Sequence, residues 1–258
     1  MNILVCVKLI PDPAVPGELD PTTNTLKRAG KLILDESDSY GVEMALQLRD
    51  AAGSGEVILA SMSPGDDVSG LRTALAMGAD RAILVSDPAL QGSDALTTAR
   101  ILAKCAERAG DVELVISATE STDGYTGTVP AQIGELLGWP SLTFTRKIEI
   151  ADGVAKTERQ TEAGYDEVTA PLPAVVAVTA GVVEPRYPSF KGIMAAKNKP
   201  VDNVTAADLG VEPVGWAGAQ QAITTVEAAP ARAAGEKFED DGTGAEKIVA
   251  FLENLKVV

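Results

Sequence analysis

The sequence predicts an α/β fold, in which a mostly parallel sheet has helices on both faces. In the first half of the chain, short and continuously apolar segments alternate with segments whose apolar residues recur at helical spacing. Continuous apolar runs are typical of strands that are buried on both faces. Strands that alternate with helices of about 10–15 residues indicate βαβ units, which place their strands side by side in a parallel sheet.

Four strands and four helices are expected in this first part. The strands are residues 3–7, 57–61, 82–85 and 114–118, and the helices are about 40–51, 67–77, 94–109 and 129–137. Gly78 follows the second helix, as glycine commonly does at helix ends. Pro130 falls in the first turn of the fourth helix, where its missing N–H group loses no hydrogen bond.

The pattern changes after about residue 143. Residues 147–150 and 154–158 flank an Ala-Asp-Gly turn, which predicts a hairpin insertion over about 143–170. Residues 174–179 are expected as another buried strand, and 201–209 as a short strand that leads into a helix.

The last part of the chain is expected to be an extended arm. Residues 211–242 have too few large apolar side chains to form a core of their own. The sequence Thr-Gly-Ala-Glu at 243–246 has the spacing of a capping box and predicts a terminal amphipathic helix. Such a helix, placed after a weak linker, is expected to dock on its own domain or on another chain.

Composition and charge exclude several kinds of protein. The chain has 258 residues, a formal net charge of −15 and no histidine. An acidic surface disfavours binding to nucleic acid or anionic lipid, and the apolar runs are too short to insert into a membrane. Without histidine, a Ser-His-Asp triad and most zinc sites are ruled out, and we expect no metal site. Any redox chemistry would come from a bound organic cofactor.

The two cysteines and the N-terminus indicate a compartment. Cys6 and Cys105 are far apart in the sequence and form no CxxC pair. The N-terminus lacks the charged and apolar regions of a signal peptide. We therefore expect free thiols and a cytoplasmic location.

The loop after the strand at 114–118 is the first candidate site. The chain has no GxxxxGK[ST] motif and no GxGxxG after a strand, so the usual nucleotide fingerprints are not supported. Residues 119–130 instead contain two glycines, four threonines, one serine and no cation. Exposed backbone N–H groups at a helix N-terminus predict a phosphate cradle. An ordinary capped loop is the alternative.

A second polar cluster, Asp35-Glu36-Ser37-Asp38, precedes the first helix. Its carboxylates could accept hydrogen bonds from a ribose, or they could cap the helix. Cys6-Val7-Lys8 lies at the end of the first strand, at the same expected edge of the sheet. For Cys6, a buried strand cysteine is the simpler interpretation.

Residues 184–200, EPRYPSFKGIMAAKNKP, are the third candidate site, which we call the 184–200 segment. It contains one anion, two aromatic residues and four cations, which are Arg186, Lys191, Lys197 and Lys199. Its three prolines exclude one continuous helix. Pro185 and Pro188 are expected to hold the first half extended, before a short helix over 192–197.

Together these segments resemble the beta subunit of electron transfer flavoprotein. The resemblance rests on NILVCVKLIPD at the N-terminus, RTALAMGADRAILV at 72–85, ESTDGYTGT at 120–128, and LPAVVAV with EPRYPSFKGIMAAKNKP over 172–200. It implies a Rossmann-like nucleotide-binding domain of the adenine-nucleotide hydrolase type over residues 1–210. It also implies that residues 211–258 dock on a partner subunit.

The resemblance implies a function as well. Family members pair with an alpha subunit, and the heterodimer holds one FAD, mainly on alpha, and one AMP on beta. The FAD takes electrons from dehydrogenases such as acyl-CoA dehydrogenase in fatty acid β-oxidation and passes them to a membrane quinone oxidoreductase. The beta subunit is then expected to be an electron carrier subunit rather than an enzyme, with no catalytic residue of its own.

The resemblance places AMP along the edge of the sheet. It implies that the phosphate lies on the loop, that the adenosine lies beside Cys6 and residues 35–38, and that the adenine packs near Met62. The expected cofactor-binding residues are Cys6, Asp35, Glu36, Ser37, Asp38, Met62, Ala118, Thr119, Glu120, Ser121, Thr122, Asp123, Gly124, Tyr125, Thr126, Gly127, Thr128 and Val129.

Three alternatives stay open. Bifurcating relatives hold a second FAD in place of AMP and show an acidic residue and a Gln-Val pair in this loop, where Tyr125 and Thr128-Val129 stand here. A stand-alone adenine-nucleotide-binding regulator of the universal-stress type would leave the 184–200 segment unexplained. An ATP-dependent enzyme would need a lysine and metal-binding carboxylates near a loop that offers only Glu120 and Asp123.

In the family, the loop after the buried strand anchors the partner dehydrogenase through an apolar side chain, often leucine. The matching residue here is Phe190. We expect Phe190 and the lysines to face outward, and three apolar residues to pin the segment to the core. The expected partner-binding residues are Tyr187, Phe190, Lys191, Ile193 and Met194, of which Tyr187, Ile193 and Met194 are the pinning residues.

Overall fold

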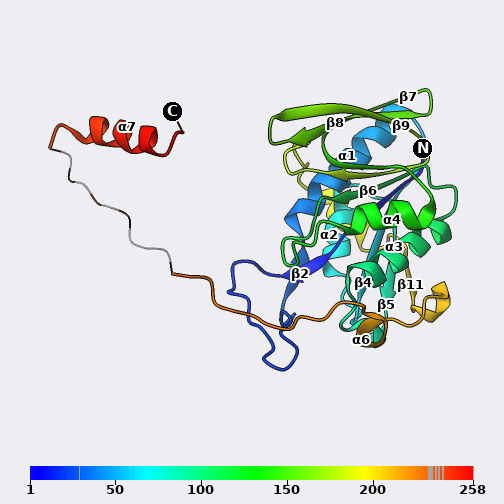
Figure 1. The fold of residues 1–258 in the computed structure, drawn as a ribbon. Coiled ribbons are helices and arrows are strands. Elements are labelled where there is room, and N and C mark those ends of the chain that lie inside the picture. Colours follow the sequence, from blue (N-terminus) through cyan, green and yellow to red (C-terminus); the bar gives the residue numbers. More distant parts are fainter. Residues whose placement is uncertain (29, 232–234, 236, 238, 240, 258) are drawn as a thin grey trace. The chain divides into compact units, whose positions relative to one another are not determined.

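The structure is a computed structural model that describes every residue except 29, 232–234, 236, 238, 240 and 258 (Figure 1). The described residues form two compact units, Met1–Thr224 and Thr225–Val258. The first unit contains all the strands of the described chain, and the second contains the terminal helix.

The first unit is built on a nine-stranded sheet with the strand order β11-β5-β4-β1-β6-β10-β7-β8-β9. The strands are β1 (Ile3–Cys6), β4 (Val57–Ser63), β5 (Arg81–Ser86), β6 (Leu114–Ala118), β7 (Ser141–Ala151), β8 (Val154–Thr161), β9 (Gly164–Pro171), β10 (Ala174–Val178) and β11 (Val201–Val204). Neighbours from β11 to β7 run parallel, and β7, β8 and β9 run antiparallel. The expected mostly parallel sheet is confirmed.

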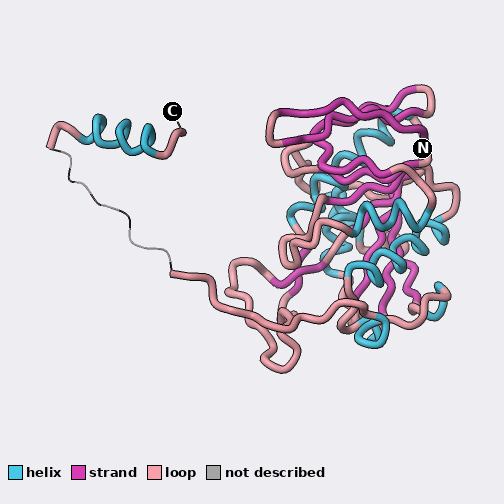
Figure 2. The backbone as a smooth tube through the Cα atoms, in the orientation of Figure 1, coloured by secondary structure: helices cyan, strands magenta, loops and turns pink. Residues whose placement is uncertain are grey.

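Helices cover both faces of this sheet (Figure 2). The helices that supply the first core are α1 (Glu36–Ala52), α2 (Ser69–Met77) and α5 (Phe190–Ala196), and those that supply the second are α3 (Ala95–Ala109) and α4 (Val129–Leu137). Residues of the central strand β1 alternate between the cores: Ile3 and Val5 belong to the first, Leu4 and Cys6 to the second. A strand buried on both faces needs a continuous apolar sequence, which explains the absence of polar alternation.

The expected elements of the first half are present. The bounds predicted for β6 and α4 agree with the structure. α1 begins earlier than predicted, at Glu36, because the Asp35 carboxylate accepts the Ser37 N–H at 3.1 Å and caps the helix.

The insertion predicted over about 143–170 is present, but it contains three strands rather than the two of a hairpin. β8 pairs not only with β7 but also with β9, a third strand that the sequence did not predict. The β9 sequence GYDEVTAP is largely exposed on both faces, so it lacks the apolar alternation that would reveal a half-buried strand. A two-stranded sheet of β2 (Leu9–Pro11) and β3 (Leu32–Leu34) was also missed, because three residues are too few to show a period.

The first unit also extends past residue 210, where the arm was expected to begin. Val211 is buried, and the short helix α6 (Gly215–Gly218) packs on the 3₁₀ turn η1 (Pro88–Leu90). The Gln220 N–H donates to the Asp94 carboxylate at 2.8 Å. Because of these contacts the two units separate at residues 224–225 rather than at 210–211.

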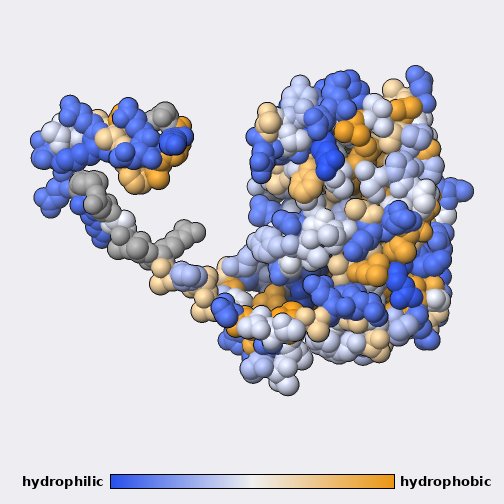
Figure 3. Space-filling view, in the orientation of Figure 1, coloured by the Kyte–Doolittle hydropathy of each residue, from blue (hydrophilic) through white to orange (hydrophobic). Residues whose placement is uncertain are grey.

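The second unit contains the expected terminal helix, α7 (Gly244–Asn254). Its predicted capping box is not formed, because the Thr243 side chain makes no capping hydrogen bond and its hydroxyl donates to Asp241 instead, at 2.5 Å. Ile248, Phe251 and Leu255 are each more than half exposed, and apolar atoms gather on one side of this helix (Figure 3). Among the described residues, no helix combines the length and apolarity needed to cross a membrane.

Candidate functional site

The first two candidate sites meet at one edge of the sheet. β4, β1 and β6 are parallel neighbours, so their carboxyl ends lie side by side. The chain passes from β1 to β4 on one side and later to β6 on the other, so the strand order reverses at β1. Ligands of open α/β sheets bind beyond the carboxyl ends of the strands, beside such a reversal. The fold therefore brings the predicted residues to the position where this architecture binds ligands.

The loop after β6 turns tightly before α4 begins. The Ser121 carbonyl accepts hydrogen bonds from the N–H groups of Gly124 at 3.3 Å and Tyr125 at 2.9 Å. Tyr125 and Gly127 have φ values of 48° and 68°, a left-handed conformation that glycine adopts freely and tyrosine rarely does. Thr128 makes no side-chain capping hydrogen bond. Within the described residues no side chain caps this helix, so its N-terminal N–H groups are available to an anion.

Two cations from distant parts of the chain reach this loop. The Lys8 ammonium lies 2.5 Å from Asp123 Oδ1 and 3.1 Å from Ser121 Oγ, and Arg28 Nε donates to Asp123 Oδ2 at 2.9 Å. Burial alone would raise the pKa of the Asp123 carboxyl, but Lys8 and Arg28 hold that pKa below its usual range. Lys8 and Arg28 thus neutralise Asp123 and bring two cationic groups to the loop, where they can interact with a phosphate.

Sequence reasoning placed Lys8 at this edge of the sheet without selecting it as a site residue, and it missed Arg28. Lys8 and Arg28 are 115 and 95 residues away from Asp123 along the chain. The loop has no cation of its own, as noted above, and only the strand order places Lys8 beside it. The available signal was the position of Lys8 just after β1, at the same edge as the loop.

The cluster at 35–38 serves mainly to join α1 to the loop. Asp35 is fully buried and accepts hydrogen bonds from the Ser37 hydroxyl at 2.7 Å and from the Thr122 N–H at 2.8 Å. Asp38 is buried too and accepts the Lys8 N–H at 2.6 Å. Burial and the nearby Asp35 raise the pKa of Asp38 well above its usual range. Asp35 thus caps the helix, and Glu36 is the exposed member of the cluster.

Cys6 and Met62 lie on the face of the sheet that α3 and α4 cover. Cys6 is buried, and burial raises the pKa of its thiol, which stays protonated at neutral pH. Met62 is half-buried at the end of β4. Ser61 Oγ on β4 and Gln132 Oε1 on α4 are buried without a hydrogen-bond partner in the described chain. Sequence reasoning did not select them, because one polar residue in an apolar run is no ligand signal.

The 184–200 segment presents apolar side chains to the outside. Helix α5 begins at Phe190, and the Ser189 hydroxyl caps it by accepting the Gly192 N–H at 3.0 Å. Tyr187 is 91% exposed and Phe190 is 81% exposed. Ile193 and Met194, at 47% and 49%, are about half exposed.

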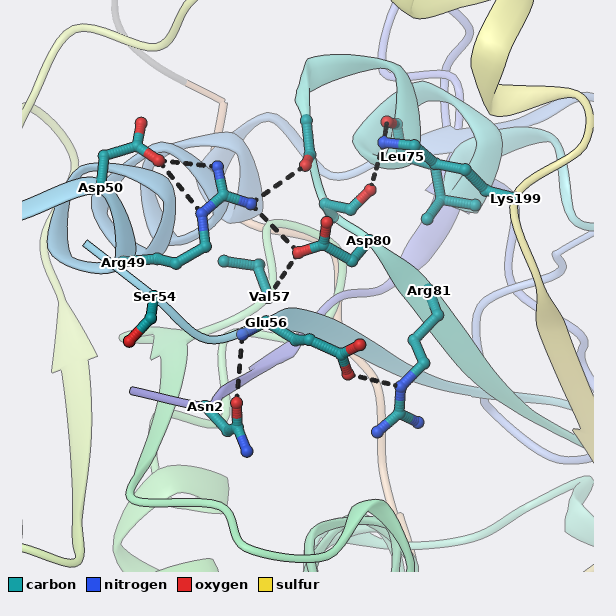
Figure 4. A network of polar contacts seen from close by, with 12 residues as sticks. Asn2, Arg49, Asp50, Ser54, Glu56, Val57, Leu75, Asp80, Arg81 and Lys199 are labelled. Carbon is teal, nitrogen blue, oxygen red and sulfur yellow. Dashed lines mark hydrogen bonds and ion pairs between the residues drawn. The ribbon is translucent and has the colours of Figure 1, made fainter. Parts of the chain in front are cut away.

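The expectation that Tyr187, Ile193 and Met194 pin this segment to the core is therefore wrong. Polar contacts anchor it instead, and one of them is the pair between Arg186 and Glu43. The Lys199 ammonium donates to the carbonyls of Ala79 at 2.5 Å and Leu75 at 3.0 Å, and Figure 4 shows Lys199 beside Leu75. Lys199 thus faces inward, contrary to the expectation for the lysines. The reason is that α1 and α2 offer this segment a carboxylate and terminal carbonyls.

The groups at this edge of the sheet are suited to binding a ligand rather than to making or breaking bonds. The edge combines N–H donors of the α4 N-terminus, the positive charge of Lys8 and Arg28, and the apolar surface of Met62. In the described residues no group of three or more Cys, Asp or Glu could hold a metal ion. Cys6 and Cys105 are both buried and unpaired.

The fold and this edge define a Rossmann-like α/β protein. The family model of the electron transfer flavoprotein domain matches residues 23–209. Over 264 residues the chain is 41% identical to the electron transfer flavoprotein subunit beta of Mycobacterium bovis, covering 100% of this chain and 99% of that protein. A subunit beta of Thermoanaerobacterium thermosaccharolyticum is 37% identical over 99% of this chain and 98% of its own length. The chain therefore belongs to the electron transfer flavoprotein family.

The resemblance to the beta subunit is confirmed by these full-length relatives. Subunits of this family are electron carriers, and the beta subunit pairs with an alpha subunit. The caffeyl-CoA reductase-Etf complex subunit CarD of Acetobacterium woodii is also similar, at 37% identity over 83% of this chain and 81% of that protein. The family match favours an electron-transfer subunit over a stand-alone regulator.

Proposed function

We propose that this chain binds AMP, pairs with an alpha subunit that holds most of the FAD, and passes electrons from dehydrogenases to a quinone oxidoreductase. The observation that best supports AMP is the uncapped N-terminus of α4, with Lys8 and Arg28 beside the loop that leads into it. A helix N-terminus favours a phosphate through its free N–H groups and its dipole. The cations compensate the second negative charge of the phosphate.

The rest of the edge fits an adenosine. Met62 offers apolar surface for a base, and Gln132 Oε1 on α4, which covers the same face of the sheet, is a buried polar atom that lacks a partner in the described chain. Buried polar atoms without partners are rare, and a bound nucleotide is one group that would supply the missing hydrogen bond. The exposed Glu36 stays our candidate for the ribose, because Asp35 is already occupied as a helix cap.

The chain itself would provide no bond-making group, since FAD supplies the electron chemistry when bound. Phe190 and its exposed neighbours form the surface on which acyl-CoA dehydrogenase or a related dehydrogenase docks. The apolar side of α7 docks on the alpha subunit, because such exposed apolar surface marks an interaction site. We propose a cytoplasmic location, in keeping with two unpaired thiols.

Mass spectrometry of the purified heterodimer tests the nucleotide. We expect one AMP and one FAD per heterodimer, with AMP lost after Lys8→Met but retained after Lys27→Met, a control on an exposed surface pair with Glu18. Two FAD and no AMP would overturn the AMP assignment. That result would support the bifurcating alternative, which the similarity to the CarD subunit keeps as second candidate.

A further inference from the structure

The 184–200 segment is held at its start by an ion pair between Arg186, which is partly exposed, and the buried carboxylate of Glu43. In the Arg186 guanidinium, Nε donates to Glu43 Oε2 at 2.6 Å and Nη2 donates to Glu43 Oε1 at 3.0 Å. The backbone N–H of Arg186 also donates to Glu43 Oε2, at 3.3 Å. The Glu43 side chain is only 4% exposed and also accepts a hydrogen bond from Gln47 at 2.8 Å. Both carboxylate oxygens therefore have partners.

This geometry fixes the direction of Arg186. When two nitrogens of a guanidinium donate to the two oxygens of one carboxylate, both the distance and the orientation of the guanidinium are restricted. Separating the pair would leave the buried Glu43 carboxylate without a partner, which costs free energy. Arg186 therefore stays in contact with Glu43 on α1. Burial alone would raise the pKa of Glu43, but the hydrogen bonds from Arg186 and Gln47 lower it, so the carboxylate is charged at neutral pH.

The two halves of the segment are anchored differently. Arg72 donates to the carbonyls of Ala196 and Lys199, both at 2.7 Å, and fastens the second half to α2. Gly192 approaches α2 so closely that an added Cβ would lie 2.4 Å from the Ala76 carbonyl oxygen. Within the described chain, Arg186 alone among residues 184–188 forms hydrogen bonds or ion pairs. The first half therefore depends on Glu43.

We propose that the Glu43–Arg186 pair is a positioning device that holds the exposed Tyr187–Phe190 surface in its binding conformation before a dehydrogenase arrives. The proposal rests on the docking role of Phe190 given above. A segment that is already ordered loses less conformational entropy on binding, so the pair strengthens docking without touching the partner. Arg186 and Glu43 are positioning residues and act through Phe190.

Limited trypsin digestion of the heterodimer tests the pair without any dehydrogenase. Glu43→Gln keeps the shape of the side chain and removes its charge, so Arg186 is released. We expect cleavage after Arg186 to become about tenfold faster, because a protease cuts a segment that opens more often. Cleavage after Lys191 in the same digest should not change, and neither should cleavage in the Glu107→Gln variant, which alters an exposed carboxylate on α3. Unchanged cleavage after Arg186 would overturn the proposal.

Steady-state reduction by an acyl-CoA dehydrogenase then tests the consequence. We expect Glu43→Gln to raise the KM for the flavoprotein about tenfold with kcat unchanged, as expected for one or two side chains that must be ordered on binding. FAD content and reduction by dithionite should match the unaltered protein. A structural defect would instead lower FAD content and both reactions together, which would count against positioning.

A double variant separates positioning from direct contact. In a Phe190→Ala background, Glu43→Gln should have no further effect on KM, because the two residues act through one contact. Independent, additive effects would overturn the proposal. If Phe190→Ala alone leaves KM unchanged while trypsin still detects the released Arg186, the docking role of Phe190 fails and the conformational role of the pair stands.

Discussion

The loop at 119–128 and the 184–200 segment follow neighbouring parallel strands, β6 and β10, yet they are built in opposite ways. The loop turns Asp123 inward, where this residue and the nearby Asp35 accept hydrogen bonds from other segments, and leaves Glu120 exposed. The 184–200 segment places two of its cations, Arg186 and Lys199, against acceptors near α1 and α2 and turns its apolar side chains outward.

The difference follows from what each segment packs against. The loop lies at an uncapped helix N-terminus, which offers donors to a small anion. The 184–200 segment lies against the Glu43 carboxylate and the carbonyls at the end of α2, which bind Arg186 and Lys199, while its apolar residues stay exposed. A polar interior suits a small charged ligand, and an apolar projection suits a protein surface.

Replacing Phe190 by alanine should give the largest effect and should affect only the projecting surface. An aromatic anchor at an interface contributes about 2 kcal/mol or more, so the KM of a dehydrogenase for the flavoprotein should rise about 30-fold. AMP and FAD content should not change, and mass spectrometry with steady-state kinetics measures both. Val15→Ala, at a residue that is 66% exposed elsewhere on the same unit, is the control. Equal effects in both variants would contradict the assignment of Phe190.

Changing Gly127 to valine should show the reverse pattern. Gly127 has φ 68°, so a β-branched residue is strained there by about 1–3 kcal/mol and the loop must shift. We expect AMP to dissociate about tenfold faster, which corresponds to a loss of about 1.4 kcal/mol in binding free energy. The KM of the dehydrogenase for the flavoprotein should not change.

Gly138→Val is a matched control for this variant. Gly138 has the same φ of 68°, lies at the other end of α4 and has open space around it. Both variants should lose similar thermal stability, but only Gly127→Val should release AMP. Equal AMP retention by the two variants would mean that the loop does not hold the phosphate.

The same two regions show what the sequence could and could not predict. β6 and α4 were predicted with the observed bounds because their apolar patterns are local. The contacts of Lys8 with Asp123 and of Arg186 with Glu43 join residues 115 and 143 positions apart, which no local pattern encodes. The inward placement of Tyr187 was wrongly predicted because apolar residues were assumed to be anchors, whereas charged groups anchor the segment.

Asp38→Asn should give the smallest effect and should test the interior of the charged edge. Burial and Asp35 raise the pKa of Asp38 well above its usual range, whereas in the unfolded chain it is about 3.9. At a pH between these two pKa values, the folded protein keeps a proton on Asp38 that the unfolded chain has lost. The free energy of unfolding therefore falls as the pH rises from the unfolded pKa toward the folded one. The asparagine oxygen can still accept the Lys8 N–H that Asp38 accepts at 2.6 Å. The melting temperature of the variant relative to the parent should rise between pH 5 and pH 8, and a constant difference would mean that Asp38 is already ionised in the folded protein.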